Sequence, residues 1–206
     1  MNFGQGCVSI LWWTGVFGVS GILLYYVYKT DVDFGETDGR RVQRLWLVYS
    51  TVTGFVLGLH SCDFMWIIRI AYALLAVYFV VCSVMDAMLK MVCDFFHGIG
   101  LIGGCVYLAY IQPPKEALEV IILFVGIQWF VFRKMYGPAD MTAYVICSMY
   151  LAAEDYSLLN CLLHMLVTFG ILGPVQLWKR NISAKGNLKN PVALLPYIAG
   201  AFFLII

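Results

Sequence analysis

Charged residues are scarce in this chain: Asp, Glu, Lys and Arg together make up 12% of the 206 residues, while 62% are hydrophobic. This balance excludes a soluble domain, because the surface of a soluble protein carries far more charge. The charges that are present nearly cancel, at a formal net charge of +1, which gives no reason to expect a nucleic-acid partner. The composition predicts an all-α polytopic membrane protein in contact with the lipid bilayer.

Metal-binding and redox motifs are also missing. The seven cysteines contain no C-x-x-C pair, and the three histidines follow no metal or dyad spacing. We therefore expect no metal site and no cofactor, with the cysteines acting as small apolar residues in helices. Residues 1–6 carry no Lys or Arg before the first apolar run, so this run is predicted to be a retained span rather than a secretory signal.

Long apolar runs divide the chain into eight candidate spans, with about 15 to 25 apolar residues required for each. They cover roughly residues 7–28, 45–60, 64–85, 95–111, 117–132, 141–153, 158–178 and 192–206. The division between the second and third is short, and seven spans is the competing count. No polar loop could bury a core of its own. We therefore expect one membrane domain over 1–206, with two additional N-terminal helices in 1–63 and a six-helix core in 64–206.

The basic residues predict the orientation of these spans. Eleven of the thirteen Lys and Arg residues fall in the first, third, fifth and seventh loops, whereas Lys115 lies in an even loop and Arg69 lies inside the third span. Because basic loops stay in the cytoplasm, the odd loops are predicted to be cytoplasmic and both termini to lie outside. Asp86, which ends the third span, and Asp140, which opens the sixth, then belong to the same cytoplasmic interface.

Asp86 and Asp140 are the candidate catalytic residues. A carboxylate beside hydrocarbon costs a few kcal/mol, so it is expected to serve as a charge partner, a proton path or an acid or base. Two carboxyl groups that share one proton can activate water, polarise a peptide carbonyl and protonate the leaving amine. Asp86 ends a helix and Asp140 begins one. The helix dipole therefore favours Asp86 as the proton holder and Asp140 as the base.

Three segments resemble the type IV prepilin and preflagellin peptidases. Residues 86–94 (DAMLKMVCD), followed by Phe-Phe-His-Gly, are similar to the first aspartate segment of that family, 137–140 (GPAD) to its G-x-G-D segment, and 189–200 (KNPVALLPYIAG) to its closing proline-rich helix. The resemblance covers about residues 64–206 and implies six helices, with one aspartate closing the first and the other opening the fourth. The sequence departs from the family at Cys93, where proline is usual, and at Ala139, where the second glycine is usual.

The resemblance implies a membrane-embedded aspartyl endopeptidase that cleaves the leader of prepilin-like or preflagellin-like precursors at the cytoplasmic face. Asp86 and Asp140 would be catalytic. The residues implied for substrate binding or support of the site are Asp94, Lys90, Gly137, Pro138 and Ala139. Bacterial relatives with N-methyltransferase activity carry a domain with two C-x-x-C pairs, and loop 29–44 is too short for it and lacks cysteine. We expect no need for S-adenosylmethionine.

Other interpretations stay open at this point. Asp140 could cap its helix by accepting hydrogen bonds from the amides of Thr142 or Ala143, and Asp86 could be an interfacial acid paired with Lys90. Gly137 can adopt the positive φ angles that other residues avoid, and Pro138 fixes φ near the helical value, so the chain can turn sharply into Asp140.

Two other functions also fit the sequence. In an ion- or proton-coupled transporter, Asp86, Asp140 and Arg69 would form the ion path. A non-catalytic assembly subunit with the same fold is the third interpretation. The Gly18-Val19-Ser20-Gly21 string is similar to a rhomboid serine motif, but no histidine can be placed opposite it.

Overall fold

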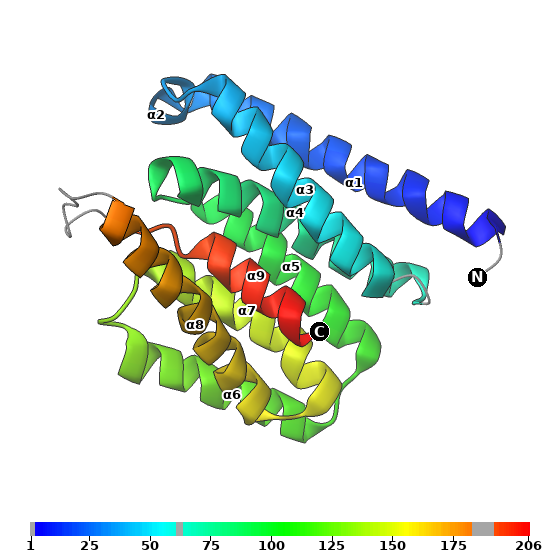
Figure 1. The fold of residues 1–206 in the computed structure, drawn as a ribbon. Coiled ribbons are helices and arrows are strands. Elements are labelled where there is room, and N and C mark those ends of the chain that lie inside the picture. Colours follow the sequence, from blue (N-terminus) through cyan, green and yellow to red (C-terminus); the bar gives the residue numbers. More distant parts are fainter. Residues whose placement is uncertain (1–2, 61–63, 183–191) are drawn as a thin grey trace. The chain divides into compact units, whose positions relative to one another are not determined.

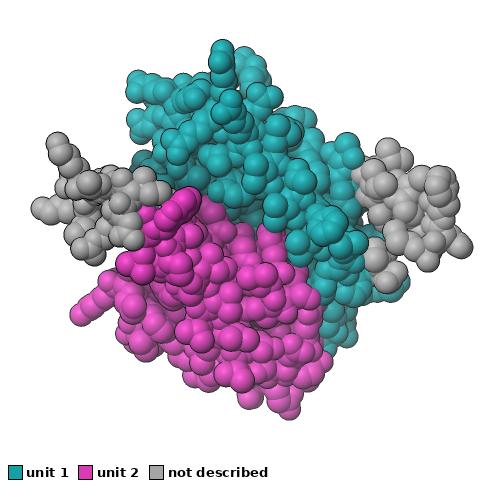
Figure 2. All heavy atoms as spheres, viewed as in Figure 1, with its two compact units in different colours: residues 1–112 teal, residues 113–206 magenta. Residues whose placement is uncertain are grey.

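The computed structural model describes residues 3–60, 64–182 and 192–206, and every regular element in these ranges is a helix (Figure 1). The predicted all-α class is therefore confirmed. The chain forms two compact units, residues 1–112 and 113–206, which Figure 2 distinguishes by colour. The predicted boundary after residue 63 falls inside the first unit, and the six-helix core over 64–206 stays a prediction.

The first unit is built around one helix. It contains α1 (Phe3–Thr30), α2 (Val32–Gly35), α3 (Gly39–His60), α4 (Trp66–Leu89) and α5 (Asp94–Ile111), and α4 contacts the other four. No charged residue occurs between Ile70 and Met85, and every residue from Leu75 to Asp86 is buried. A helix that is apolar on all sides is expected in the interior, which explains the central place of α4.

Small and aromatic residues fix the neighbours of α4. Three glycines of α5 are buried and allow a close approach of the two helices: Gly100, Gly103 and Gly104. Near the N-terminal end of α4, the hydroxyl of Tyr72 lies 3.0 Å from Nε2 of His60, and the Tyr72 ring packs edge-on against Tyr107 of α5. Arg69 donates to the carbonyl of Phe64 at 3.0 Å and lies over the Trp66 ring, so its charge sits at the N-terminal end of α4.

The second unit contains α6 (Lys115–Ile127), a π-helical turn η1 (Gln128–Phe132), α7 (Pro138–Asp155), α8 (Leu158–Ile182) and α9 (Leu195–Ile205). Helix α7 contacts α6, α8 and α9, and its residues from Ile146 to Ala153 are all buried. Nε2 of His164 in α8 lies 2.9 Å from the carbonyl oxygen of Ile198, which joins α8 to α9 inside this unit.

All eight predicted spans fall on helices. Four helices among the described residues are long and apolar enough to cross a membrane, namely Gly39–His60, Trp66–Leu89, Asp94–Ile111 and Leu158–Trp178. Helix α9 has 11 residues and is about 16 Å long, which is shorter than a hydrocarbon core of about 30 Å. The chain therefore has the apolar helices of a multi-pass membrane protein. Cys62, Lys185 and residues 189–191, on which parts of the sequence analysis depended, lie outside the described residues.

Candidate functional site

Asp86 occupies the last turn of α4 and is only 6% exposed. Helix α4 ends at Lys90, which adopts a left-handed conformation at φ 61° and donates its backbone N–H to the carbonyl of Asp86 at 3.0 Å. The Lys90 ammonium group turns back to the carbonyls of Asp86, at 3.4 Å, and Ala87, at 3.2 Å. A cation is stabilised at the negative end of a helix. The buried aspartate thus lies on a helix end whose geometry Lys90 fixes.

The next helix begins close to this end. Asp94 is exposed in the first turn of α5, and Cys93 is its N-cap residue, at φ −71°. That angle is within the range that proline requires, so the backbone at Cys93 is compatible with the proline that the resembling family usually has there. One turn further on, His97 is buried with Nδ1 3.1 Å from the hydroxyl of Tyr78 in α4, and its Nε2 has no hydrogen-bond partner in the described part of the chain.

Asp140 lies in the first turn of α7, three residues after the N-cap residue Gly137, and is half-buried. Pro138 holds the first helical position, as predicted. Gly137 does not use the positive φ that glycine permits: φ is −71° and ψ is 164°, which is the extended backbone normal for an N-cap residue. A Cβ added at Gly137 would lie 4.0 Å from Oδ2 of Asp140. The glycine therefore keeps the space beside this carboxylate free of a side chain.

These positions also bear on the capping interpretation. Gly137 is the N-cap residue of α7, so Asp140 does not occupy the N-cap position. The hydroxyl of Thr142 donates to the carbonyl of Pro138 at 2.9 Å. Asp140 instead has the third helical position, where a carboxylate is favoured by the positive end of the helix dipole. Ala139 lies half-buried between Pro138 and Asp140.

A buried hydrogen-bond chain holds the segment just before Gly137. The hydroxyl of Tyr136 donates to Oε1 of Gln128, which is fully buried in η1, and Nε2 of Gln128 donates to the sulfur of Met165 in α8 at 2.9 Å. Burial raises the pKa of Tyr136 above its ordinary value, and the negative charge of Asp140 raises it further. Tyr136 is therefore a neutral hydrogen-bond donor within electrostatic reach of Asp140.

Neither Gln128 nor Tyr136 was predicted from the sequence to belong to the site. A signal was present for Gln128, because the apolar run 117–132 contains few polar residues and an amide there must find a partner. The π-helical turn at Gln128 is a second mark of the same place, since such turns are frequent at functional sites. Tyr136 had no comparable signal, because tyrosines are common near the ends of membrane spans.

The two predicted catalytic residues belong to different units, Asp86 to the first and Asp140 to the second. Within residues 3–60, 64–182 and 192–206, no three Cys, His, Asp or Glu side chains are grouped so that they could hold a metal ion. In comparisons with known proteins, no family model, no curated protein and no solved structure matches the chain.

Proposed function

We propose that this chain is a membrane aspartyl endopeptidase, in which Asp86 and Asp140 meet at the cytoplasmic face and share one proton. The observation that carries the proposal is the place of the two residues: one buried acid in the last turn of an apolar helix and one half-buried acid in the first turn of another. Acids at such positions cost free energy unless they have a charge partner or a chemical role.

The proposed division of labour follows from the environments of the two carboxyl groups. Asp86 is buried at the negative end of α4, and both features favour the neutral acid. Lys90 acts in the opposite sense, but its side chain is exposed and its charge is screened by water. Asp140 is more accessible and lies at the positive end of α7, which favours the carboxylate. Asp140 is therefore the proposed base that activates water, and Asp86 the acid.

Eight spans with both termini outside complete the proposal. The additional spans are α1, the continuous helix formed by α6 and η1, α7, and α9 with the residues before it. The basic side chains described in the odd loops are exposed, which is consistent with a position in water beside the headgroups. They include Arg40, Arg41, Arg44, Lys90, Arg133 and Lys134.

By resemblance, the substrate is a prepilin-like or preflagellin-like precursor, with a short charged leader, a glycine before the cleaved bond and then an apolar helix. Such a helix can lie in the lipid beside the spans while the leader junction stays at the depth of the two aspartates. Lipid is as apolar as the substrate helix, so binding the helix gains little hydrophobic free energy. We therefore expect specificity to reside in the leader junction, with Asp94 and Lys90 among the residues that contact it.

An ion path is the competing proposal. In α4, Arg69 and Asp86 are 17 residues apart, which corresponds to about 25 Å along the helix. Between them α4 carries hydroxyl and thiol groups, and the imidazoles of His60 and His97 lie beside the hydroxyls of Tyr72 and Tyr78. Ion flux therefore has to be measured alongside precursor cleavage.

The test is cleavage of such a precursor by the purified protein in lipid vesicles. Asp86→Asn and Asp140→Asn should each lower the cleavage rate by about 100-fold or more, because an acid or base contributes roughly that factor. Asp155→Asn is the matched control, since Asp155 lies at the other end of α7, where it accepts a hydrogen bond from Asn160. Retained cleavage in either aspartate variant would remove the mechanism. Ion flux that both variants lose, without cleavage by the wild type, would establish the transporter instead.

A further inference from the structure

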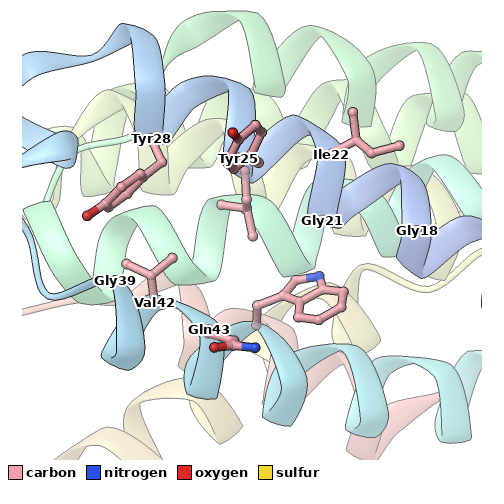
Figure 3. Close-up of a pocket in the computed structure, with 10 residues that line it drawn as sticks. Gly18, Gly21, Ile22, Tyr25, Tyr28, Gly39, Val42 and Gln43 are labelled. Atoms are coloured by element: carbon pink, nitrogen blue, oxygen red, sulfur yellow. The ribbon is translucent and has the colours of Figure 1, made fainter.

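A groove between α1 and α3 is separate from both aspartates. It has a volume of about 530 Å³ and lies wholly within the first unit (Figure 3). Its walls come from one face of α1 and the first turns of α3, and the lining residues are Gly18, Gly21, Ile22, Leu24, Tyr25, Tyr28, Gly39, Val42, Gln43 and Trp46. Gln43 is the one lining residue outside the apolar, aromatic and glycine classes. The groove therefore calls for an apolar occupant.

The helix pair is closed at one end and open at the other. Towards the start of α1, the Phe17 ring fills the space beside Gly54, where an added Cβ would clash with the ring, and Trp13 packs on Gly58. Next to this closed part, Nε1 of Trp46 donates to the hydroxyl of buried Ser20 at 3.0 Å. This bond ties the helices together and gives Ser20 a structural role. The groove begins beside this tie, at Gly18, and runs towards the C-terminal end of α1.

The length of the groove matches one acyl chain. Gly18 and Tyr28 are ten residues apart on α1, so the groove is about 15 Å long, which equals about half of a 30 Å hydrocarbon core. The groove thus has the length of one bilayer leaflet, which is the length of one acyl chain.

At the open end of the groove, a positively charged side chain lies against one of the lining residues. The Lys29 ammonium lies 4.9 Å from the centre of the Tyr25 ring, and Lys29 follows directly after Tyr28, the last lining residue on α1. Arg40 and Arg44 are exposed in the first turns of α3, next to the lining residues Gly39 and Gln43. The carboxylates of Asp31 and Asp38 accept backbone N–H groups within the same loop at 2.9 and 3.0 Å. Lys29 therefore places a positive charge at the mouth of the groove, in a loop that also carries the exposed acids Asp33 and Glu36.

We propose that this groove is a phospholipid site, in which one acyl chain lies between α1 and α3 and the phosphate contacts Lys29. The bilayer is as apolar as the groove, so the hydrophobic effect does not hold the chain there. Retention depends on the fit of the chain and on the charge contact at the mouth. We therefore expect enrichment over ordinary boundary lipid rather than an irreversibly bound molecule. The site is independent of the proposed peptidase activity.

The experiment uses the full-length protein in phosphatidylcholine vesicles with a trace of phosphatidylcholine that carries a photoactivatable diazirine on one acyl chain. After irradiation, mass spectrometry compares adducts on groove residues of α1 and α3 with adducts on the exposed α8 residues Leu159 and Leu166, which serve as the boundary-lipid reference. We expect several times more labelling in the groove than on α8. Equal labelling at the two places would overturn the proposal.

Two variants test the site from its two ends. Gly18→Leu should fill the groove, because a Cβ at Gly18 meets no atom within 4 Å, and it should remove the excess labelling. Gly15→Leu is the matched control, since Gly15 lies on the same helix with equally free space but does not line the groove. Lys29→Gln leaves the walls intact and should lower the excess only in part, by less than the about fivefold effect of one basic side chain on an anionic lipid, because phosphatidylcholine carries no net charge.

Each outcome has a defined meaning. Equal labelling of the Gly18→Leu and Gly15→Leu proteins would refute the acyl-chain position, and unchanged labelling of Lys29→Gln would refute the phosphate contact. Displacement of the lipid label by an apolar precursor helix would show that the groove takes a peptide, contrary to the proposal. Asp86→Asn should label like the wild type, so a failure of the proposed peptidase activity and a failure of this site are distinguishable.

Discussion

The hydrogen bond between Tyr136 and Gln128 should contribute measurably to the stability of the second unit. Tyr136→Phe removes the donor and leaves Oε1 of Gln128 unpaired at a fully buried position. An unpaired buried acceptor costs about 1 to 3 kcal/mol of unfolding free energy. Gln128→Leu removes the amide altogether and leaves the hydroxyl of half-buried Tyr136, which can reach water. We expect this variant to lose less, about 0.5 to 1.5 kcal/mol.

The double variant Tyr136→Phe/Gln128→Leu leaves neither group unpaired, so it should be more stable than the sum of the single effects predicts. The expected coupling free energy is about 1 to 2 kcal/mol, whereas independent sites add within about 0.5 kcal/mol. The measurement is reversible unfolding in mixed micelles, followed by tryptophan fluorescence at increasing concentrations of a denaturing detergent. Tyr26→Phe, at an exposed tyrosine in α1, is the control and should change little. Additive single effects would refute the buried bond.

Three further predictions concern ionisation, backbone conformation and the substrate contact. The pKa of Tyr136 is raised in the folded state, so its contribution to the unfolding free energy is complete below the unfolded pKa of about 10 and is lost as pH rises towards the folded pKa. In alkaline unfolding titrations, Tyr136→Phe should therefore lose less unfolding free energy above about pH 10 than the wild type. Gln112 ends α5 at φ 48°, so Gln112→Gly should raise the unfolding free energy by about 0.5 to 1 kcal/mol in the same micelle assay, and a decrease would contradict the assigned strain. Asp94→Asn, at an exposed position, should lower precursor cleavage less than tenfold and mainly through KM, whereas a loss as large as that of Asp86→Asn would make Asp94 the catalytic acid.

Hydrophobic runs predicted the helices well because a buried or lipid-facing backbone must satisfy its own hydrogen bonds, and a helix is the simple solution. The sixth span was predicted to start at Met141, which lies three residues after the start of α7. Asp86 and Asp140 both lie in terminal turns of their helices, as expected. The short helix α2 and the π-helical turn at Gln128 were not predicted, since both depend on local hydrogen bonds that the apolar pattern does not encode.

The conformation of Gly137 shows a second limit. Glycine permits positive φ but does not require it, and here the residue acts through the side chain that it lacks. The tie between Ser20 and Trp46, which are 26 residues apart, likewise depends on which faces of α1 and α3 meet. Periodicity indicates that a helix forms, but the partner of each face is decided by packing, and the same holds for the proposed meeting of the two aspartates.

The most direct test of the central claim is a disulfide between the two aspartate positions. The background is a variant without the seven native cysteines that still cleaves the precursor. In vesicles, the Asp86→Cys/Asp140→Cys protein should form an internal disulfide under mild oxidation, because a disulfide requires Cβ atoms within about 4.5 Å. The control, Asp86→Cys/Asp155→Cys, moves the second cysteine about 22 Å along α7 and should not form one. If the Asp86→Cys/Asp140→Cys protein forms its disulfide no faster than the control, this result would contradict a shared proton between Asp86 and Asp140.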